Sequence, residues 1–160
     1  MKTALALVLC ALAGSAVAAP KEAPKEEPEG DFTGSYTYTG TYTISLTSPV
    51  QQTITDSDDG HLTITASKKS GLVLTFTAKG ETCQLTAARS GKTGIKLPSG
   101  QTCEMTDKDS NADFTLTLTS GTGNLNGDSL TMNLAWKLSG SMSGVSVTGR
   151  ATENIQAESK

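Results

Sequence analysis

From position 31 onward, apolar and polar side chains alternate with a period of two residues over most of the chain. Between Phe32 and Leu46 the aromatic and aliphatic residues occupy even numbers, while threonine or serine fills the odd ones. Successive side chains of a β-strand point to opposite faces, so this period predicts strands with one apolar face. Threonine, with its branched Cβ, favours a pleated surface over a helix. We therefore expect a fold made almost entirely of strands.

The alternation recurs at several later places along the chain. It is clearest between Leu130 and Leu138, where the register points Trp136 inward and Ala135 and Lys137 outward. Further segments with the same period are Leu62–Ile64, Leu72–Phe76, Phe114–Leu118 and Val145–Ala151.

Turn-forming residues separate these segments, which predicts hairpins. The expected turns are at 58–60, 70–71, 79–80, 91–94, 98–100, 126–128 and 140–144. Links this short imply antiparallel neighbours, because parallel strands need long crossovers. The apolar faces must then be buried by curling or by stacking of sheets. The sequence predicts an all-β, antiparallel up-and-down β-barrel of about eight to ten strands, with a β-sandwich as the alternative.

The first thirty residues lie outside this pattern. Lys2, the apolar run 4–13 and the small residues 16–18 are typical of a signal peptide, which we expect to span 1–18 and to be cleaved. Residues 19–30 are rich in Pro, Glu and Lys and predict a disordered linker. A single domain over 31–157 and a tail over 158–160 complete the expected organisation. No later apolar run approaches the ~20 residues of a membrane helix, so a secreted or periplasmic protein without a transmembrane segment is expected.

Cleavage would remove Cys10 and leave two cysteines, Cys83 and Cys103. Thiols are oxidised in exported proteins, so these two are expected to form a disulfide. The disulfide would close a loop of about 20 residues, and the resulting loss of chain entropy in the unfolded state stabilises a fold by roughly 3 kcal/mol.

Composition excludes several classes of function. The chain has 160 residues and a formal net charge of -3, so it lacks the basic surface that nucleic acids require. His61 is the only histidine, and His61 beside Asp59 is the only conceivable catalytic dyad. An enzyme would need a nucleophile with a base, or a pair of carboxylates in a cleft. We expect a protein that is not an enzyme.

A family resemblance rests on the arrangement of the chain. The signal peptide, acidic Pro-rich spacer, mid-chain disulfide and Thr/Gly-rich hairpins ending at 123–134 resemble small exported bacterial β-barrel proteins of a lipocalin-like kind. The lipocalin-type Gly-x-Trp near the first strand is absent, and Gly34-Ser35-Tyr36 stands in its place. The resemblance implies a barrel, and fold alone does not determine function.

Two kinds of function suit such a barrel. One is the lipocalin-like binding of a small apolar molecule in the interior; the other is an interaction module, such as an inhibitor or an envelope protein, that binds through its loops. In either case we expect a monomer. A third interpretation is that the inward-facing aromatic residues simply form the core, with the interior filled by side chains. The residues expected to line a ligand cavity are Tyr36, Tyr38, Tyr42, Phe76, Met132 and Trp136.

Residues 107–113 carry oxygen side chains at alternate positions, as a calcium-binding loop does. The candidate ligands are Asp107, Asp109, Asn111 and Asp113. Ala112 stands where such a loop has its glycine. We therefore expect a solvated hairpin loop and no cofactor, with calcium as the alternative.

Overall fold

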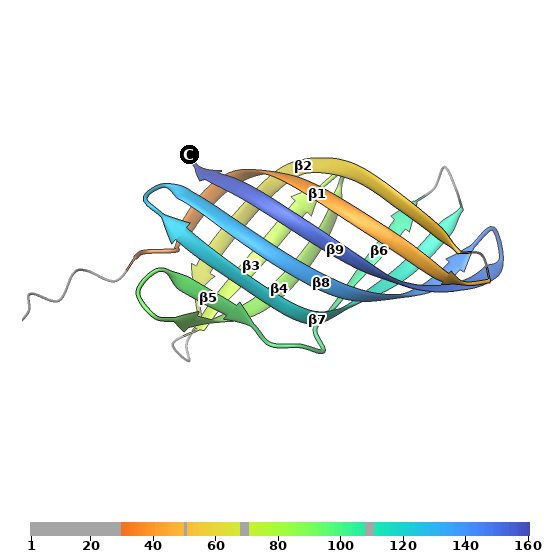
Figure 1. Cartoon of the computed structure of the whole chain (residues 1–160). Coiled ribbons are helices and arrows are strands. Elements are labelled where there is room, and N and C mark those ends of the chain that lie inside the picture. Colours follow the sequence, from red (N-terminus) through yellow and green to blue (C-terminus); the bar gives the residue numbers. More distant parts are fainter. Residues whose placement is uncertain (1–29, 50, 68–70, 108–110) are drawn as a thin grey trace, which may run out of the picture.

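The computed structural model describes residues 30–49, 51–67, 71–107 and 111–160, and its secondary structure there is β-strand (Figure 1). The expected signal peptide and most of the linker lie outside the described residues. No helix in the described ranges is apolar and long enough to cross a membrane. The nine strands are β1 (Gly34–Ser48), β2 (Gln52–Ala66), β3 (Gly71–Ala78), β4 (Glu81–Ser90), β5 (Gly94–Leu97), β6 (Thr102–Asp107), β7 (Ala112–Asn126), β8 (Ser129–Met142) and β9 (Val145–Ser159).

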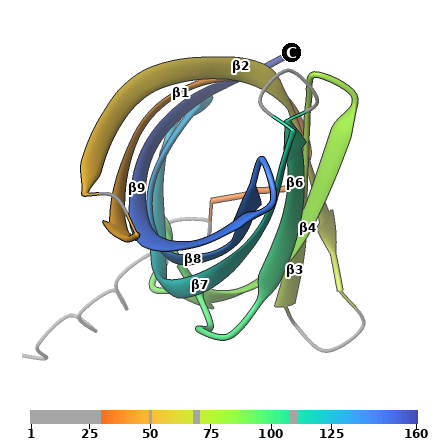
Figure 2. The same cartoon turned by 90° about the vertical axis from the view of Figure 1, so that its right-hand side faces the viewer.

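The strands form one antiparallel sheet in the order β5-β4-β3-β2-β1-β9-β8-β7-β6, and pairing of β5 with β7 closes it. Eight strands therefore surround the interior, which Figure 2 shows in a view along the barrel. This confirms the predicted barrel and rules out the sandwich. β5 and β6 both pair with β7, at 121–124 and 112–117 respectively, so they share one position in the barrel wall.

Side chains bridge the wall where β6 faces β4, since no backbone ladder joins these two strands in the described chain. Cys83 and Cys103 form the expected disulfide across this gap. On one side of it, the Gln101 side chain accepts from the Thr86 backbone N–H at 2.6 Å and donates to the Thr86 carbonyl at 2.9 Å. On the other side, the Thr106 backbone N–H donates to Glu81. We call this line of contacts the β4–β6 seam.

The segment before β1 closes one end of the barrel, the end at which β5 lies (Figure 1). Phe32 is completely buried, and its carbonyl accepts a hydrogen bond from the Tyr36 hydroxyl at 3.0 Å. The Arg89 guanidinium lies 5.3 Å from the centre of the Phe32 ring and also donates to the Gly30 carbonyl. The side chains of Phe32, Tyr36 and Arg89 therefore pack together at this end.

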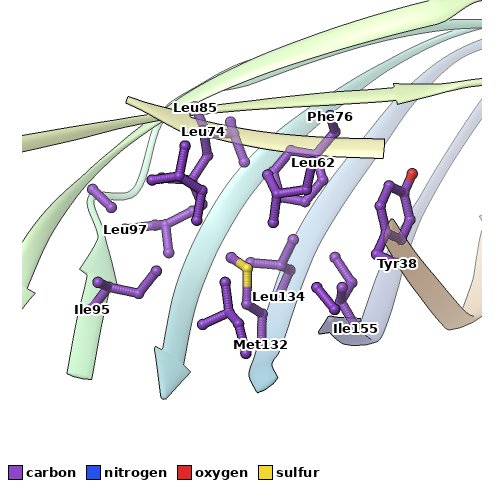
Figure 3. Close-up of a cluster of buried hydrophobic side chains, with 14 of the residues drawn as sticks. Tyr38, Leu62, Leu74, Phe76, Leu85, Ile95, Leu97, Met132, Leu134 and Ile155 are labelled. Atoms are coloured by element: carbon purple, nitrogen blue, oxygen red, sulfur yellow. The ribbon is translucent and has the colours of Figure 1, made fainter. Parts of the chain in front are cut away.

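The alternation read from the sequence sets which side chains point inward. Trp136 is buried and Lys137 exposed, as predicted. Figure 3 shows the tightly packed part of the core, with Met132 beside Leu134 and Ile155, and with Tyr38 at its edge. A second buried cluster, toward the other end, contains Leu46, Ala112, Phe114, Leu138 and Val147.

Two expectations about boundaries differ from the structure. Residues 58–60 lie within β2 rather than in a turn, and the chain reverses instead just after Ser48, where the bond to Pro49 is cis. Gly60 serves packing here, because a Cβ on it would lie 2.9 Å from the Tyr38 ring. Glu158 and Ser159 of the expected tail belong to β9, and the Ser159 N–H donates to the Asp128 carbonyl.

Candidate functional site

An interior cavity of about 230 Å³ lies on the side of the packed core away from Phe32. Its wall draws on every strand except β5, so it is a feature of the whole barrel rather than of one loop. β3 and β4 are short at this end: β3 pairs with β2 only from His61 to Ala66, and residues 52–60 of β2 continue beyond it. Lys79, Glu81 and Glu104 stand at the rim thus left open.

Four of the six aromatic and thioether residues expected at a ligand site line this cavity: Tyr38, Tyr42, Phe76 and Trp136. The Tyr38 and Phe76 rings meet edge to face, with centroids 5.8 Å apart. The other two do not line it. Tyr36 lies at the closed end, where its hydroxyl donates a hydrogen bond to the Phe32 carbonyl, and Met132 lies in the packed core. The sequence register gave the correct face for both but not their depth along the barrel.

Two carboxylates, Asp58 on β2 and Glu153 on β9, also face the cavity. Both lie beside Gly40 of β1, the strand between β2 and β9. A Cβ on Gly40 would clash with Asp58 Oδ1 and lie 3.4 Å from Glu153 Oε1. The missing side chain of Gly40 thus leaves room for both acids inside the barrel.

Burial dominates the electrostatics of this pair. Desolvation, reinforced by the charge of Asp58, raises the pKa of Glu153 from 4.5 to about 7, although the nearby Trp136 side chain opposes the rise. Desolvation also raises the pKa of Asp58, opposed by its hydrogen bond with the Tyr38 hydroxyl and by the charge of Lys79. The pKa of the Tyr38 phenol is raised as well, by burial and by Asp58. The cavity therefore disfavours uncompensated negative charge.

Two buried polar atoms at the cavity lack hydrogen-bond partners. One is Asp58 Oδ1, an acceptor, and the other is Trp136 Nε1, a donor. Trp136 is only 5% exposed, so water does not readily satisfy its indole N–H. That N–H approaches Glu153 closely enough to affect its pKa without reaching hydrogen-bond geometry. Unsatisfied polar atoms are rare in protein interiors, and both belong to residues that line one cavity.

Sequence reasoning missed the two acids. The signal for Glu153 was present, because it continues the inward series of odd positions through Ala151 to Ile155. Asp58 likewise shares the even phase of Leu62 and Ile64, but its place before Asp59-Gly60 made it resemble a turn residue. A charged residue in the apolar phase of a strand is the pattern that identifies both.

The other candidate residues lie apart from the cavity. His61 and Asp59 are exposed on the outer face of β2, and the Lys160 ammonium lies 3.4 Å from His61 Nδ1.

In the proposed calcium loop, Asp109 and the side chain of Asp107 lie outside the described residues. Asn111 is exposed in a left-handed turn conformation, and Asp113 accepts a hydrogen bond from Thr106 across the ladder. The described part of the chain holds no group of three His, Cys, Asp or Glu residues suited to a metal.

Comparison with known proteins gives no family. No family model and no curated protein matches the chain. A protein of unknown function of the DUF3598 family from Nostoc punctiforme is 11% identical with a TM-score of 0.37, over 84% of this chain and 51% of that one. A "putative outer membrane protein" from Bacteroides fragilis is 13% identical with a TM-score of 0.43, over 79% and 50%. The chain spans about half the length of these structures.

Proposed function

We propose that this protein is an exported, non-enzymatic barrel that binds a small molecule with an apolar body in its interior. The cavity lined by Tyr38, Phe76 and Trp136 carries this proposal. An apolar cavity of ~150 Å³ is enough to hold benzene, so the 230 Å³ found here, with its open rim, suits a molecule of one to three rings. The Cys83–Cys103 disulfide is compatible with a periplasmic or extracellular location.

The lining of the cavity supports binding. It is mostly aromatic and aliphatic, as in sites that hold small apolar molecules. Nucleophilic catalysis would need a base beside a nucleophile, and His61, the only histidine of the chain, is exposed on the outer face of β2.

The test is to fill the cavity. Ala151 lines it and is buried, so Ala151→Phe should occupy the ligand space, whereas Ala135→Phe adds the same ring outside the barrel on β8. The probe is phenylnaphthylamine, an uncharged fluorophore whose emission rises in apolar surroundings. We expect the wild type and Ala135→Phe to bind it and Ala151→Phe to lose most of the binding. Equal binding by all three proteins would place the probe elsewhere and overturn the proposal.

A further inference from the structure

The cavity contains one buried hydrogen-bond acceptor that has no partner in the described chain. Asp58 Oδ1 is buried without a partner, and the Glu153 carboxyl lies beside it on the other side of Gly40. Both oxygens lie within 3.4 Å of the point that a Cβ of Gly40 would occupy. One ammonium group, with its three donors, can therefore reach both carboxylates.

The aromatic rings around the two acids suit a cation as well. Tyr38, Tyr42 and Trp136 line the same cavity, and the electron-rich faces of tyrosine and tryptophan attract ammonium groups. Trp136 supplies the second observation, because its buried indole N–H has no partner. An ionised Glu153 can accept from that N–H and from a bound ammonium at once.

We propose that the molecule bound in the cavity is an organic amine, whose ammonium group lies between Asp58 and Glu153 and whose apolar body packs on Phe76 and Leu134. This inference rests on the proposed function and specifies the class of ligand. A carboxylate-bearing ligand, such as a fatty acid, meets repulsion from both acids at this position. Calcium fits poorly at this position, because it takes six to eight oxygens and only Asp58 and Glu153 lie beside Gly40, whereas Glu81 and Glu104 stand at the rim.

Binding of an amine should be coupled to ionisation of Glu153. The other titratable or charged groups that face this part of the interior are Tyr38, Tyr42, Asp58, Lys79, Glu81 and Glu104. Burial holds much of Glu153 protonated near neutral pH, whereas an alkylammonium stays charged up to about pH 10. Amine affinity should therefore rise between about pH 6 and 8, with a proton released on binding at the lower value.

The experiment compares three probes of the same shape by calorimetry at about pH 8: phenethylamine, phenethyl alcohol and phenylpropionate. The variants Asp58→Asn and Glu153→Gln remove the charge but keep the size of each acid. The controls are Asp59→Asn and Glu158→Gln, which change exposed acids on the same two strands. We expect the amine to bind at least roughly tenfold more tightly than the alcohol, as a charged hydrogen bond provides. Asp58→Asn and Glu153→Gln should remove that difference and leave the binding of the alcohol unchanged, which also verifies their folding.

Three outcomes overturn the inference. They are equal affinity for the amine and the alcohol in the wild type, preference for phenylpropionate, or amine binding that survives both substitutions. If these occur while phenylnaphthylamine still binds in the cavity, the proposed function stands and only the ligand class is wrong. Failure of phenylnaphthylamine to respond to Ala151→Phe refutes the proposed function itself.

Discussion

Asp58 and Glu153 come from different strands and approach each other inside the barrel across Gly40. Their carboxylates share a cavity with four aromatic rings and the open rim beside Lys79. Burying two acids opposes folding unless a proton or a partner neutralises them. The stability of the ligand-free protein should therefore depend on pH through these two carboxyl groups.

Stability should fall as the pH rises through neutrality. The pKa of Glu153 is raised from 4.5 to about 7, so the native state holds this proton more tightly than the unfolded chain does. Its contribution is complete below about pH 4.5 and is lost as the pH rises through about 7, a change on the order of 3 kcal/mol. Asp58, whose pKa is also raised, acts in the same direction. Urea midpoints measured from about pH 5 to 8 should fall less in Glu153→Gln than in the wild type.

Glu158→Gln is the control for this experiment, since Glu158 is exposed on β9. It should reproduce the pH dependence of the wild type. A Glu153→Gln protein with an unchanged pH dependence would show that Glu153 titrates normally and is not buried as described.

The stability of the β4–β6 seam should depend on Gln101. Gln101→Ala removes the partner of the backbone N–H and carbonyl of Thr86, which are exposed and can bind water instead, so we expect a loss of about 0.5–1.5 kcal/mol in the free energy of unfolding. Gln84→Ala, on the outward face of β4, removes only a long hydrogen bond to Thr75 and should be near neutral. Denaturant midpoints give both values, and equal effects of the two substitutions would contradict the assigned role of Gln101.

Reduction of the Cys83–Cys103 disulfide should weaken the same seam. The expected loss is about 2–5 kcal/mol, as for native bridges in small secreted domains. Mass spectrometry before and after reduction should show a gain of two hydrogens, and free alkylation of both thiols without reductant would contradict the bridge.

Gly60→Ala tests whether residues 58–60 form a strand or a turn. In β2 the added methyl group collides with the Thr77 carbonyl and the Tyr38 ring, so we expect a loss of about 1–3 kcal/mol. Asp59→Ala, at the exposed neighbouring position, should have little effect. Thermal unfolding measures both, and equal tolerance of the two changes would show that Gly60 is not packed against Tyr38 and Thr77 as its place in β2 requires.

The residues around Gly60 also show how far sequence reasoning reaches. Between bulges, alternation assigns each side chain to a face, because a strand has only two faces, and so it correctly buried Leu62 and Trp136. It does not fix position along the barrel axis, which depends on the stagger between strands. Tyr36 and Tyr38 therefore looked equivalent, although one lies at the closed end and the other in the cavity.

The cavity acids were hidden for a different reason. Asp-Asp-Gly is a frequent turn sequence, yet β2 passes straight through it, paired with β1 and with the Tyr38 ring packed over Gly60. Asp58 and Glu153 lie close together because β1 pairs with both of their strands, and this strand order is a long-range property of the sheet. Local pattern alone cannot provide it.

Trp136→Ala should be more damaging than Lys137→Ala but milder than truncation in a filled core. A fully packed tryptophan loses about 3–5 kcal/mol on replacement by alanine, while Trp136 borders existing space and should lose less. Lys137 is exposed, so its replacement should change stability by less than ~0.5 kcal/mol. Urea midpoints give the comparison. A near-neutral Trp136→Ala would show that the strand register is wrong.

The central claim, that the aromatic cavity is a ligand site, is tested most directly at the indole of Trp136. The chain contains one tryptophan, so its indole N–H gives a single resonance in a nitrogen–proton correlation spectrum. On titration with phenylnaphthylamine, the uncharged probe, we predict a saturable shift of this resonance, together with nuclear Overhauser contacts between the ligand rings and the indole. An indole resonance that stays in place while amides on the outer faces of the strands shift would contradict the claim.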